Sequence, residues 1–127
     1  MTDPAQLSLS AAQRAMESGD LTAAALLEAC LERIDAREPD VLAWVTMDRE
    51  AARAKAKALD AAGRSGALGG IPVGLKDIIE TADFGTEYNS VIYKGYRPPV
   101  DAAVVSTIKN AGGFSLAEAV AWLAERD

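Results

Sequence analysis

The residue whose setting most strongly suggests chemistry is Lys76, near the end of the run GGIPVGLKD at residues 69–77. The run is apolar and rich in glycine, and buried strands seldom hold a lysine. Loss of water shifts a lysine toward its neutral form, in which the amine can act as a base. Two interpretations follow: Lys76 is a desolvated base, or it lies at the exposed end of a strand and pairs with Asp77 or Glu80.

Other common catalytic and binding patterns do not fit this sequence. The chain has no histidine and a single cysteine, Cys30, which excludes Ser-His-Asp and Cys-His catalysis within the chain and an internal disulfide. A phosphate-binding loop requires G-x-x-x-x-G-K-[ST], but here Leu75 precedes the lysine and Asp77 replaces the hydroxyl residue. The acidic residues between 77 and 87 lack calcium-loop spacing. We therefore expect neither a metal nor a cofactor.

Composition indicates one globular domain and disfavours two classes of partner. The 127 residues are 50% hydrophobic and 25% charged, which is typical of a folded domain. A formal net charge of −6 argues against nucleic acid or an anionic membrane as the main partner. The sequence shows no signal-peptide pattern and no apolar run approaching the roughly 20 residues that a membrane helix needs. We therefore expect a cytoplasmic protein.

Helices are expected to dominate the first 62 residues. Ser10, Thr22 and Asp48 each suit the N-cap of a helix, and each precedes a run with helical periodicity. Ser10 also forms a capping box with Gln13, and the helix after Thr22 should end near residues 38–39. The apolar stripe of that second helix has the spacing i, i+3, i+4, i+7 and consists of Leu27, Cys30, Leu31 and Ile34. Cys30 is therefore interpreted as a core residue.

The second half of the chain is expected to be less regular. Short strands are predicted at residues 41–47 and on either side of Lys76, because both segments are apolar, short and partly β-branched. Asp101 is predicted to cap a helix that runs to about Ala111, with an apolar stripe formed by Ala103, Val104, Thr107 and Ile108. The final segment, residues 114–127, contains a capping box and helical apolar spacing, so we predict a C-terminal amphipathic helix.

Residues 66 to 113 resemble the N-terminal part of the amidase signature family. The stretch GALGGIPVGLKDIIETADFGTEYNS resembles the segment that carries the catalytic lysine of that family, and RPPVDAAVVSTIKNAGG resembles the loop and helix that follow it. With similar helices upstream, the resemblance covers roughly residues 7 to 113. It implies an α/β fold: a mostly α-helical fragment of a mixed α/β domain with few short strands. We divide the chain into an incomplete domain at 1–113 and a divergent helix at 114–127.

The resemblance also implies a reaction, the hydrolysis of amide C–N bonds by a serine, a second serine in a cis peptide and a lysine. Lys76 matches the lysine, and the lack of histidine is consistent with that triad. Tyr88, Asn89 and Ser90 are predicted to contact a small amide substrate or to support Lys76. The two serines of the family lie downstream in a segment rich in glycine and serine, and this chain has no such segment. We therefore expect the chain to be inactive alone, as a truncated hydrolase would be.

Two alternatives remain open. The chain could be a non-catalytic, amidase-derived helical interaction module, an interpretation that the predicted final helix with Trp122 favours. It could also complement a partner chain that supplies the serines. In either case, part of a larger domain exposes strand edges and apolar faces, so a homo-oligomer or a complementing protein chain is expected.

Overall fold

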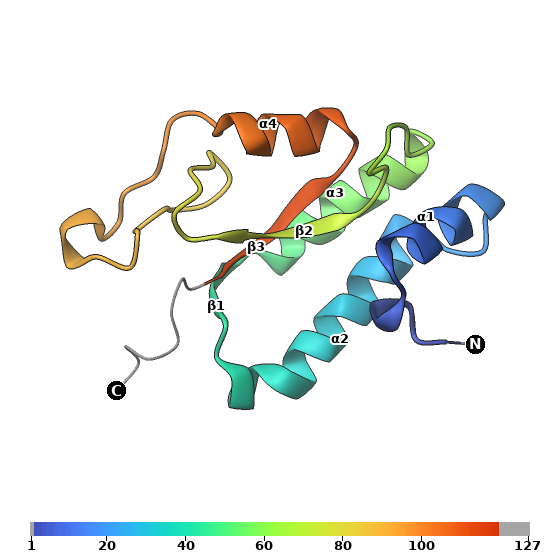
Figure 1. Ribbon diagram of the computed structural model, residues 1–127, viewed down its shortest axis with the longest axis horizontal. Coiled ribbons are helices and arrows are strands. Elements are labelled where there is room, and N and C mark those ends of the chain that lie inside the picture. The colour runs from blue at the N-terminus through green and yellow to red at the C-terminus, as the bar shows by residue number, and fades with distance from the viewer. Residues whose placement is uncertain (1, 120–127) are drawn as a thin grey trace.

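The computed structural model of this protein describes residues 2–119, with side chains up to residue 115. Helices account for most of its regular structure, and they surround a small sheet (Figure 1). In chain order, the elements are η1 (Pro4–Gln6), α1 (Leu9–Ser18), α2 (Ala23–Val41), β1 (Trp44–Met47), α3 (Arg49–Ala61), β2 (Pro72–Lys76), η2 (Val91–Tyr93), α4 (Ala103–Asn110) and β3 (Phe114–Ala119). None of the helices within residues 2–119 is both long and apolar enough to cross a membrane.

Two of the three predicted N-caps in the first half are confirmed, and one is shifted. The side chains of Thr22 and Asp48 accept the backbone N–H groups of Ala25 and Ala51, as N-caps do. The prediction that Ser10 caps α1 is wrong, because Ser8 does so and accepts the N–H of Ala11. Ser8 has the extended backbone that an N-cap requires, whereas Ser10 already lies inside the helix.

The sheet has the strand order β1-β3-β2, with β3 antiparallel to β1 and parallel to β2. The amphipathic helix predicted for residues 114–127 is therefore wrong for residues 114–119, and its remainder lies outside the described residues. The capping box favours a helix only through hydrogen bonds within one turn. As the central strand, β3 instead pairs its backbone with neighbours on both edges, and this outweighs the local preference.

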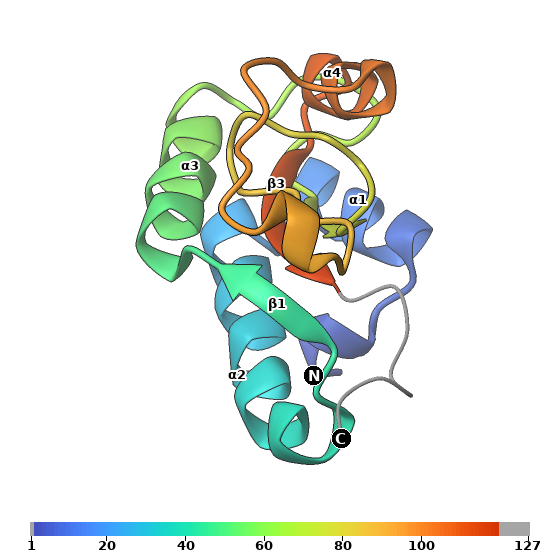
Figure 2. The ribbon, with the colours of Figure 1, turned by 90° about the vertical axis from the view of Figure 1, so that its left-hand side faces the viewer.

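The core lies between the sheet and the first three helices. Leu27 and Leu31 of α2, Ala56 of α3 and Phe114 of β3 form one buried cluster, and Met16 of α1 belongs to a second. Figure 1 shows α4 on the upper side of the sheet and α2 on the lower side, and Figure 2 shows α3 beside α2. The stripe predicted for α2 is confirmed at Leu27 and Leu31, while Cys30 and Ile34 are half-buried.

The prediction for α4 is correct for its extent but wrong for its cap and its buried face. The N-cap of α4 is Ala102, which provides no side-chain hydrogen bond. Asp101 instead accepts bonds from the Thr81 hydroxyl, the Ala82 N–H and the Lys109 ammonium. These bonds turn Asp101 toward the 81–82 segment. On the helix itself Val105 is buried, whereas Val104, a member of the predicted stripe, is half exposed.

Asp60, near the end of α3, ties the first three helices together. Its two carboxylate oxygens accept the N–H groups of Ala23 and Ala24, at 2.9 and 3.0 Å, in the first turn of α2. Arg64 donates to Asp60 at 2.5 Å and to the carbonyl of Met16 at the end of α1. Burial pushes the pKa of Asp60 up, but the two amide bonds and Arg64 outweigh it, so the pKa is lowered.

Candidate active site

Lys76 is the last residue of β2, and its side chain is exposed. Its neighbours Leu75 and Asp77 are both buried, because successive side chains of an extended chain point to opposite sides. The expected desolvation of Lys76 is therefore absent from this structure. The alternative prediction is correct only in part, since Lys76 lies at an exposed strand end but forms no ion pair with Asp77 or Glu80.

Gly74 explains one of the glycines in the run that leads to Lys76. A Cβ atom added at Gly74 would lie 2.6 Å from the Trp44 indole ring, closer than real contacts allow. The missing side chain therefore lets Trp44 of β1 lie over β2, across the intervening strand β3. Gly70, further upstream, has a φ of +82°, a value that favours glycine.

Asp77 joins the end of β2 to a turn ten residues away. One carboxylate oxygen accepts the N–H of Glu87 at 3.0 Å, and the Asp77 carbonyl accepts the N–H of Tyr88 at 3.1 Å. Asp77 is only 3% exposed, so these bonds lie away from competing water. The segment that follows Lys76 is thus fixed to residues 87–88.

Tyr88 and Asn89 both adopt left-handed backbone conformations, with φ values of 54° and 53°. Such conformations are unfavourable for residues other than glycine and persist only where surrounding contacts enforce them. One such contact is the Tyr88 hydroxyl, which donates to the Glu80 carboxylate at 2.5 Å. This hydrogen bond, helped by partial burial, raises the pKa of Tyr88 to about 12.

Ser90 follows this turn and has a local structural role. Its hydroxyl accepts the N–H of Ile92 at 3.3 Å and so caps η2. Asn89 and Ser90, with Asp77, border an open hollow of about 320 Å³ that is also lined by Val45, Glu87, Val91 and Lys94. Lys76 is not among these lining residues. The structure therefore brings Tyr88, Asn89 and Ser90 into one turn linked to Asp77, the residue that follows Lys76.

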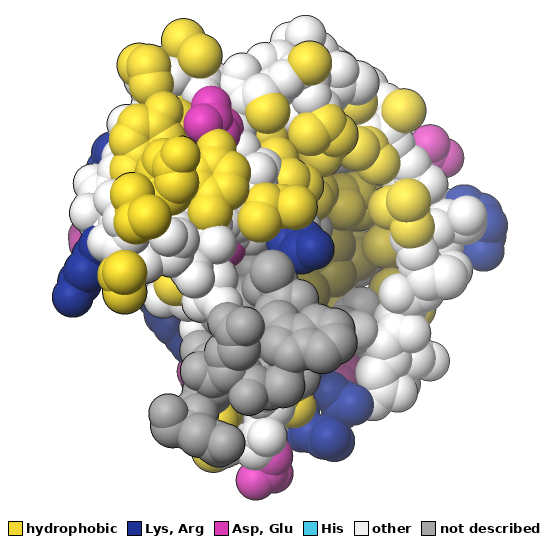
Figure 3. Space-filling view, turned by 60° about the vertical axis from the view of Figure 1, so that its left-hand side comes forward, with side chains coloured by type: hydrophobic (Ala, Val, Ile, Leu, Met, Phe, Trp, Pro, Cys, Tyr) yellow, Lys and Arg dark blue, Asp and Glu magenta, His cyan; other side chains and the backbone are white. Residues whose placement is uncertain are grey.

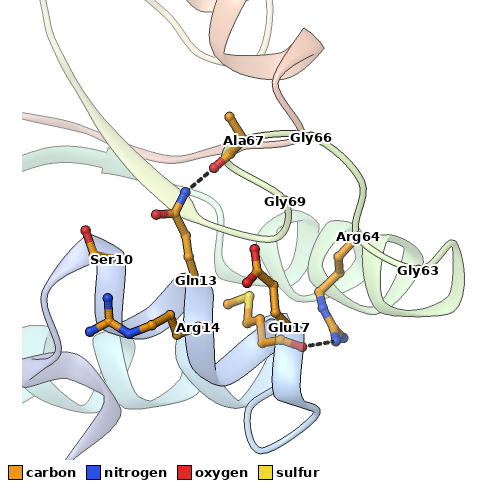
Figure 4. Close-up of a pocket in the computed structure, with 10 residues that line it drawn as sticks. Ser10, Gln13, Arg14, Glu17, Gly63, Arg64, Gly66, Ala67 and Gly69 are labelled. Carbon is orange, nitrogen blue, oxygen red and sulfur yellow. Dashed lines mark hydrogen bonds between the residues drawn. The ribbon is translucent and has the colours of Figure 1, made fainter.

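A larger hollow, of about 560 Å³, lies between α1 and the glycine-rich loop 63–69 (Figure 4). The side-chain amide of Gln13 donates to the carbonyl of Ala67, and Arg64 donates to the carbonyl of Met16. None of the predicted site residues lines this hollow. Sequence reasoning missed it because nothing in the composition of α1 indicates that it faces the loop.

Glu17 lines the larger hollow, and Asp77 and Glu87 line the smaller one, but these carboxylates do not form a metal site. Among the residues that the structure describes, no three of the types His, Cys, Asp and Glu lie where they could hold one ion. The arrangement near Lys76 consists instead of an amine, a buried carboxylate, a phenol and backbone amides. Such groups can bind a small polar substrate through hydrogen bonds and can transfer protons.

Comparison with known families gives one match that spans most of the chain. The family model described as Amidase matches residues 25–120. Similar proteins include a glutamyl-tRNA(Gln) amidotransferase subunit from Chloroflexus aggregans, which is 44% identical over 116 residues. The corresponding subunit from Sinorhizobium fredii is 38% identical over 119 residues. These matches cover 88% and 91% of this chain, respectively, but only 24% of each relative.

Solved structures give the same result for the fold. The native peptide amidase of Stenotrophomonas maltophilia matches with a TM-score of 0.81 and 32% identity, over 91% of this chain and 25% of that enzyme. An amidase family protein of Bacillus anthracis matches with a TM-score of 0.79 and 25% identity, over 90% of this chain and 24% of that protein. The chain therefore spans about a quarter of the length of each of these proteins.

Proposed function

This chain belongs to the amidase family, and we propose that it is the lysine-bearing N-terminal portion of an amidase-signature hydrolase. In this proposal Lys76 is the base of a Ser-cisSer-Lys triad that cleaves the C–N bond of a small amide. The observation that carries the proposal is the position of Lys76. It ends a strand inside the region that matches the family, next to a turn held in a strained conformation.

The proposed division of labour follows from the chemistry of the triad. A neutral amine removes the proton of a serine hydroxyl, and the resulting alkoxide attacks the amide carbonyl. A base that lacks a nucleophile and hydrogen-bond donors for the oxyanion supplies only a small part of the rate acceleration. General-base assistance by itself contributes about 10²–10⁴-fold, well below the total acceleration of a typical enzyme. We therefore propose that this polypeptide by itself has no efficient amidase activity.

A complementing polypeptide is the proposed source of the serines. Support comes from the segment around η2, where Val91 and Ile92 are 90% and 85% exposed and the nearby Tyr93 and Tyr96 are also exposed. Figure 3 shows hydrophobic side chains gathered on this side of the molecule. Apolar surfaces of this kind commonly mark protein–protein contacts.

A complementation assay tests the proposal. The chain is mixed with the part of the Chloroflexus aggregans relative that lies outside the match, and hydrolysis of a panel of simple amides is followed by ammonia release. We expect turnover with the mixture but not with either part alone, and a loss of at least about 100-fold on Lys76→Ala, the scale of general-base assistance. Lys57→Ala, at an exposed lysine on α3 away from both hollows and from η2, is the matched control and should retain activity.

The second candidate function is a non-catalytic interaction module, which the exposed apolar surface at Val91 and Ile92 also favours. The same assay separates the two. Binding of the second polypeptide without any lysine-dependent turnover would support the module and contradict the hydrolase. Lysine-dependent turnover of the chain alone would contradict the proposed need for a partner.

A further inference from the structure

We propose that Asp77 is a positioning residue of the candidate site, which fixes the turn at residues 87–90 relative to the backbone of Lys76. The catalytic meaning of this inference rests on the proposed function, whereas the physical linkage between the two segments does not. Asp77 does not itself contact the Lys76 amine in this structure. It acts by determining where Tyr88, Asn89 and Ser90 lie with respect to the strand that presents the lysine.

The first argument is that Asp77 belongs to both segments at once. On its N-terminal side, β2 is held by parallel pairing with β3 up to the register Lys76↔Ala119. On its other side, Asp77 accepts two backbone N–H groups from consecutive residues, Glu87 and Tyr88. The lysine backbone and the turn therefore share a single anchor.

The second argument is that a buried carboxylate is a costly way to fill space. An ionised group loses its hydration on burial, and an apolar side chain of similar volume would avoid that cost. Asp77 forms no ion pair with any described residue that would offset the loss. What the carboxylate provides is a strong acceptor for the Glu87 N–H, so its role is the hydrogen bond rather than packing.

The third argument is that the turn needs external support. Tyr88 and Asn89 are consecutive residues in the left-handed region, which an isolated chain rarely populates. Two further bonds help to hold the segment: the Tyr88 hydroxyl donates to Glu80, and the Gly95 N–H donates to the Glu87 carboxylate at 2.8 Å. Both of these involve the side chains of Tyr88 and Glu87, whereas the bonds to Asp77 come from the backbone N–H groups of the same two residues and link the turn to the strand of Lys76.

The test compares Asp77→Asn with two variants that remove the side-chain acceptor of the Glu87 N–H, while the backbone carbonyl that accepts the Tyr88 N–H is present in all three variants. Asparagine keeps an oxygen that can accept the Glu87 N–H, while Asp77→Ala lacks it, and Asp77→Leu lacks it but preserves volume. The measurements are hydrogen exchange at the Glu87 and Tyr88 amides and the titration of the Tyr88 phenol in a Tyr93→Phe/Tyr96→Phe background. Far-UV circular dichroism establishes whether each variant is folded. If Asp77→Ala does not fold, the comparison is made with Asp77→Leu.

We expect rescue by the conservative variant. In Asp77→Asn, the two amides stay protected and the Tyr88 pKa stays near 12. In Asp77→Ala or Asp77→Leu, exchange at the Glu87 amide accelerates at least tenfold, because this amide loses its acceptor. Exchange at the Tyr88 amide also accelerates and the Tyr88 pKa falls toward about 10, its ordinary value, because the turn is no longer fixed to the strand. Glu80→Gln is the matched control, because it lowers the Tyr88 pKa directly while leaving the Glu87 amide protected. Unchanged exchange in folded Asp77→Leu would overturn the inference.

The effect of Asp77 on the surroundings of Lys76 is measured from the NMR signal of that lysine. Reductive methylation with ¹³C gives each lysine an NMR signal, and Lys76→Arg assigns the one that belongs to Lys76. We expect this signal to move in Asp77→Leu and not in the more distant charge variant Asp35→Asn. In the complementation assay, Asp77→Leu should lower kcat more than it raises KM. Failure of complementation with intact Asp77 would contradict the proposed function alone, since the exchange and titration results do not depend on it.

Discussion

Among single residues, Gly74 shows most directly why the strand of Lys76 contains a glycine. The Trp44 ring occupies the space that a side chain at residue 74 would need. We expect Gly74→Val to lower the free energy of unfolding by about 1–3 kcal/mol through overpacking. Urea denaturation measures this difference.

A double-mutant cycle provides the control for that prediction. Trp44→Leu removes the ring that a valine at residue 74 would meet, so Gly74→Val should cost less in this background than in the wild-type chain. If the two substitutions were simply additive, the contact with Trp44 would not be the reason for the glycine.

Asp60 leads to a prediction about pH. Its pKa is lowered in the folded chain, so its stabilising effect is present above its ordinary pKa, near 3.8, and is lost as pH falls through the lower folded value. Asp60→Asn should cost about 1.5–3 kcal/mol at neutral pH, the range for hydrogen bonds to charged groups. Thermal unfolding between pH 7 and pH 2 should show this cost shrinking on the acidic side. Asp35→Asn, in an exposed ion pair with Arg49, should show a much smaller cost throughout.

Among the helices and strands, the start of α1 shows that the residue with the capping-box motif, Ser10, is not the residue that caps the helix. Ser8 accepts the N–H of Ala11, whereas Ser10 lies within the helix and is exposed. We expect Ser8→Ala to destabilise the chain by about 1 kcal/mol and Ser10→Ala to change stability by less than about 0.5 kcal/mol. Equal effects in chemical denaturation would mean that the cap is not where the structure has it.

The strand β3 shows how pairing with distant strands overrides the local helical preference of a segment. Its residues carry a helical capping pattern, yet their backbone pairs with β1 on one side and β2 on the other. β1 lies about 70 residues earlier in the chain, at Trp44–Met47. Because no local pattern records such a distant pairing, the prediction from residues 114–127 alone favoured a helix.

For the molecule as a whole, the apolar surface around η2 is the feature that the rest of the described fold leaves uncovered. We expect the chain to self-associate as its concentration rises, since Val91 and Ile92 are almost fully exposed. Val91→Ser/Ile92→Ser should reduce this association without a loss of stability, as measured by size-exclusion chromatography with light scattering. Leu9→Ser, at a half-exposed position on α1, is the control and should leave the association intact. A wild-type chain that stays monomeric at all concentrations would contradict the expectation.

Features that depend on short stretches of chain could be predicted from the sequence. Thr22 and Asp48 were identified as caps because a cap needs only the next few backbone amides. The order of glycine, proline, glycine, lysine and aspartate in residues 69–77 was the most specific part of the resemblance from which the family was predicted, and the match to the family model confirms that family. The catalytic role of Lys76 and the contacts of Tyr88, Asn89 and Ser90 with substrate remain predictions.

Features that depend on segments far apart in the chain came from the folded structure. Folding exposed Lys76 and buried Asp77, turned the Asp101 carboxylate to the Thr81–Ala82 segment in place of the first amides of α4, and made residues 114–119 a central strand. In the last two cases a side chain or backbone group had a local partner available and took one from a different segment. The physical reason is that burial and strand pairing satisfy hydrogen bonds between distant segments, and composition and periodicity within one segment contain no record of them.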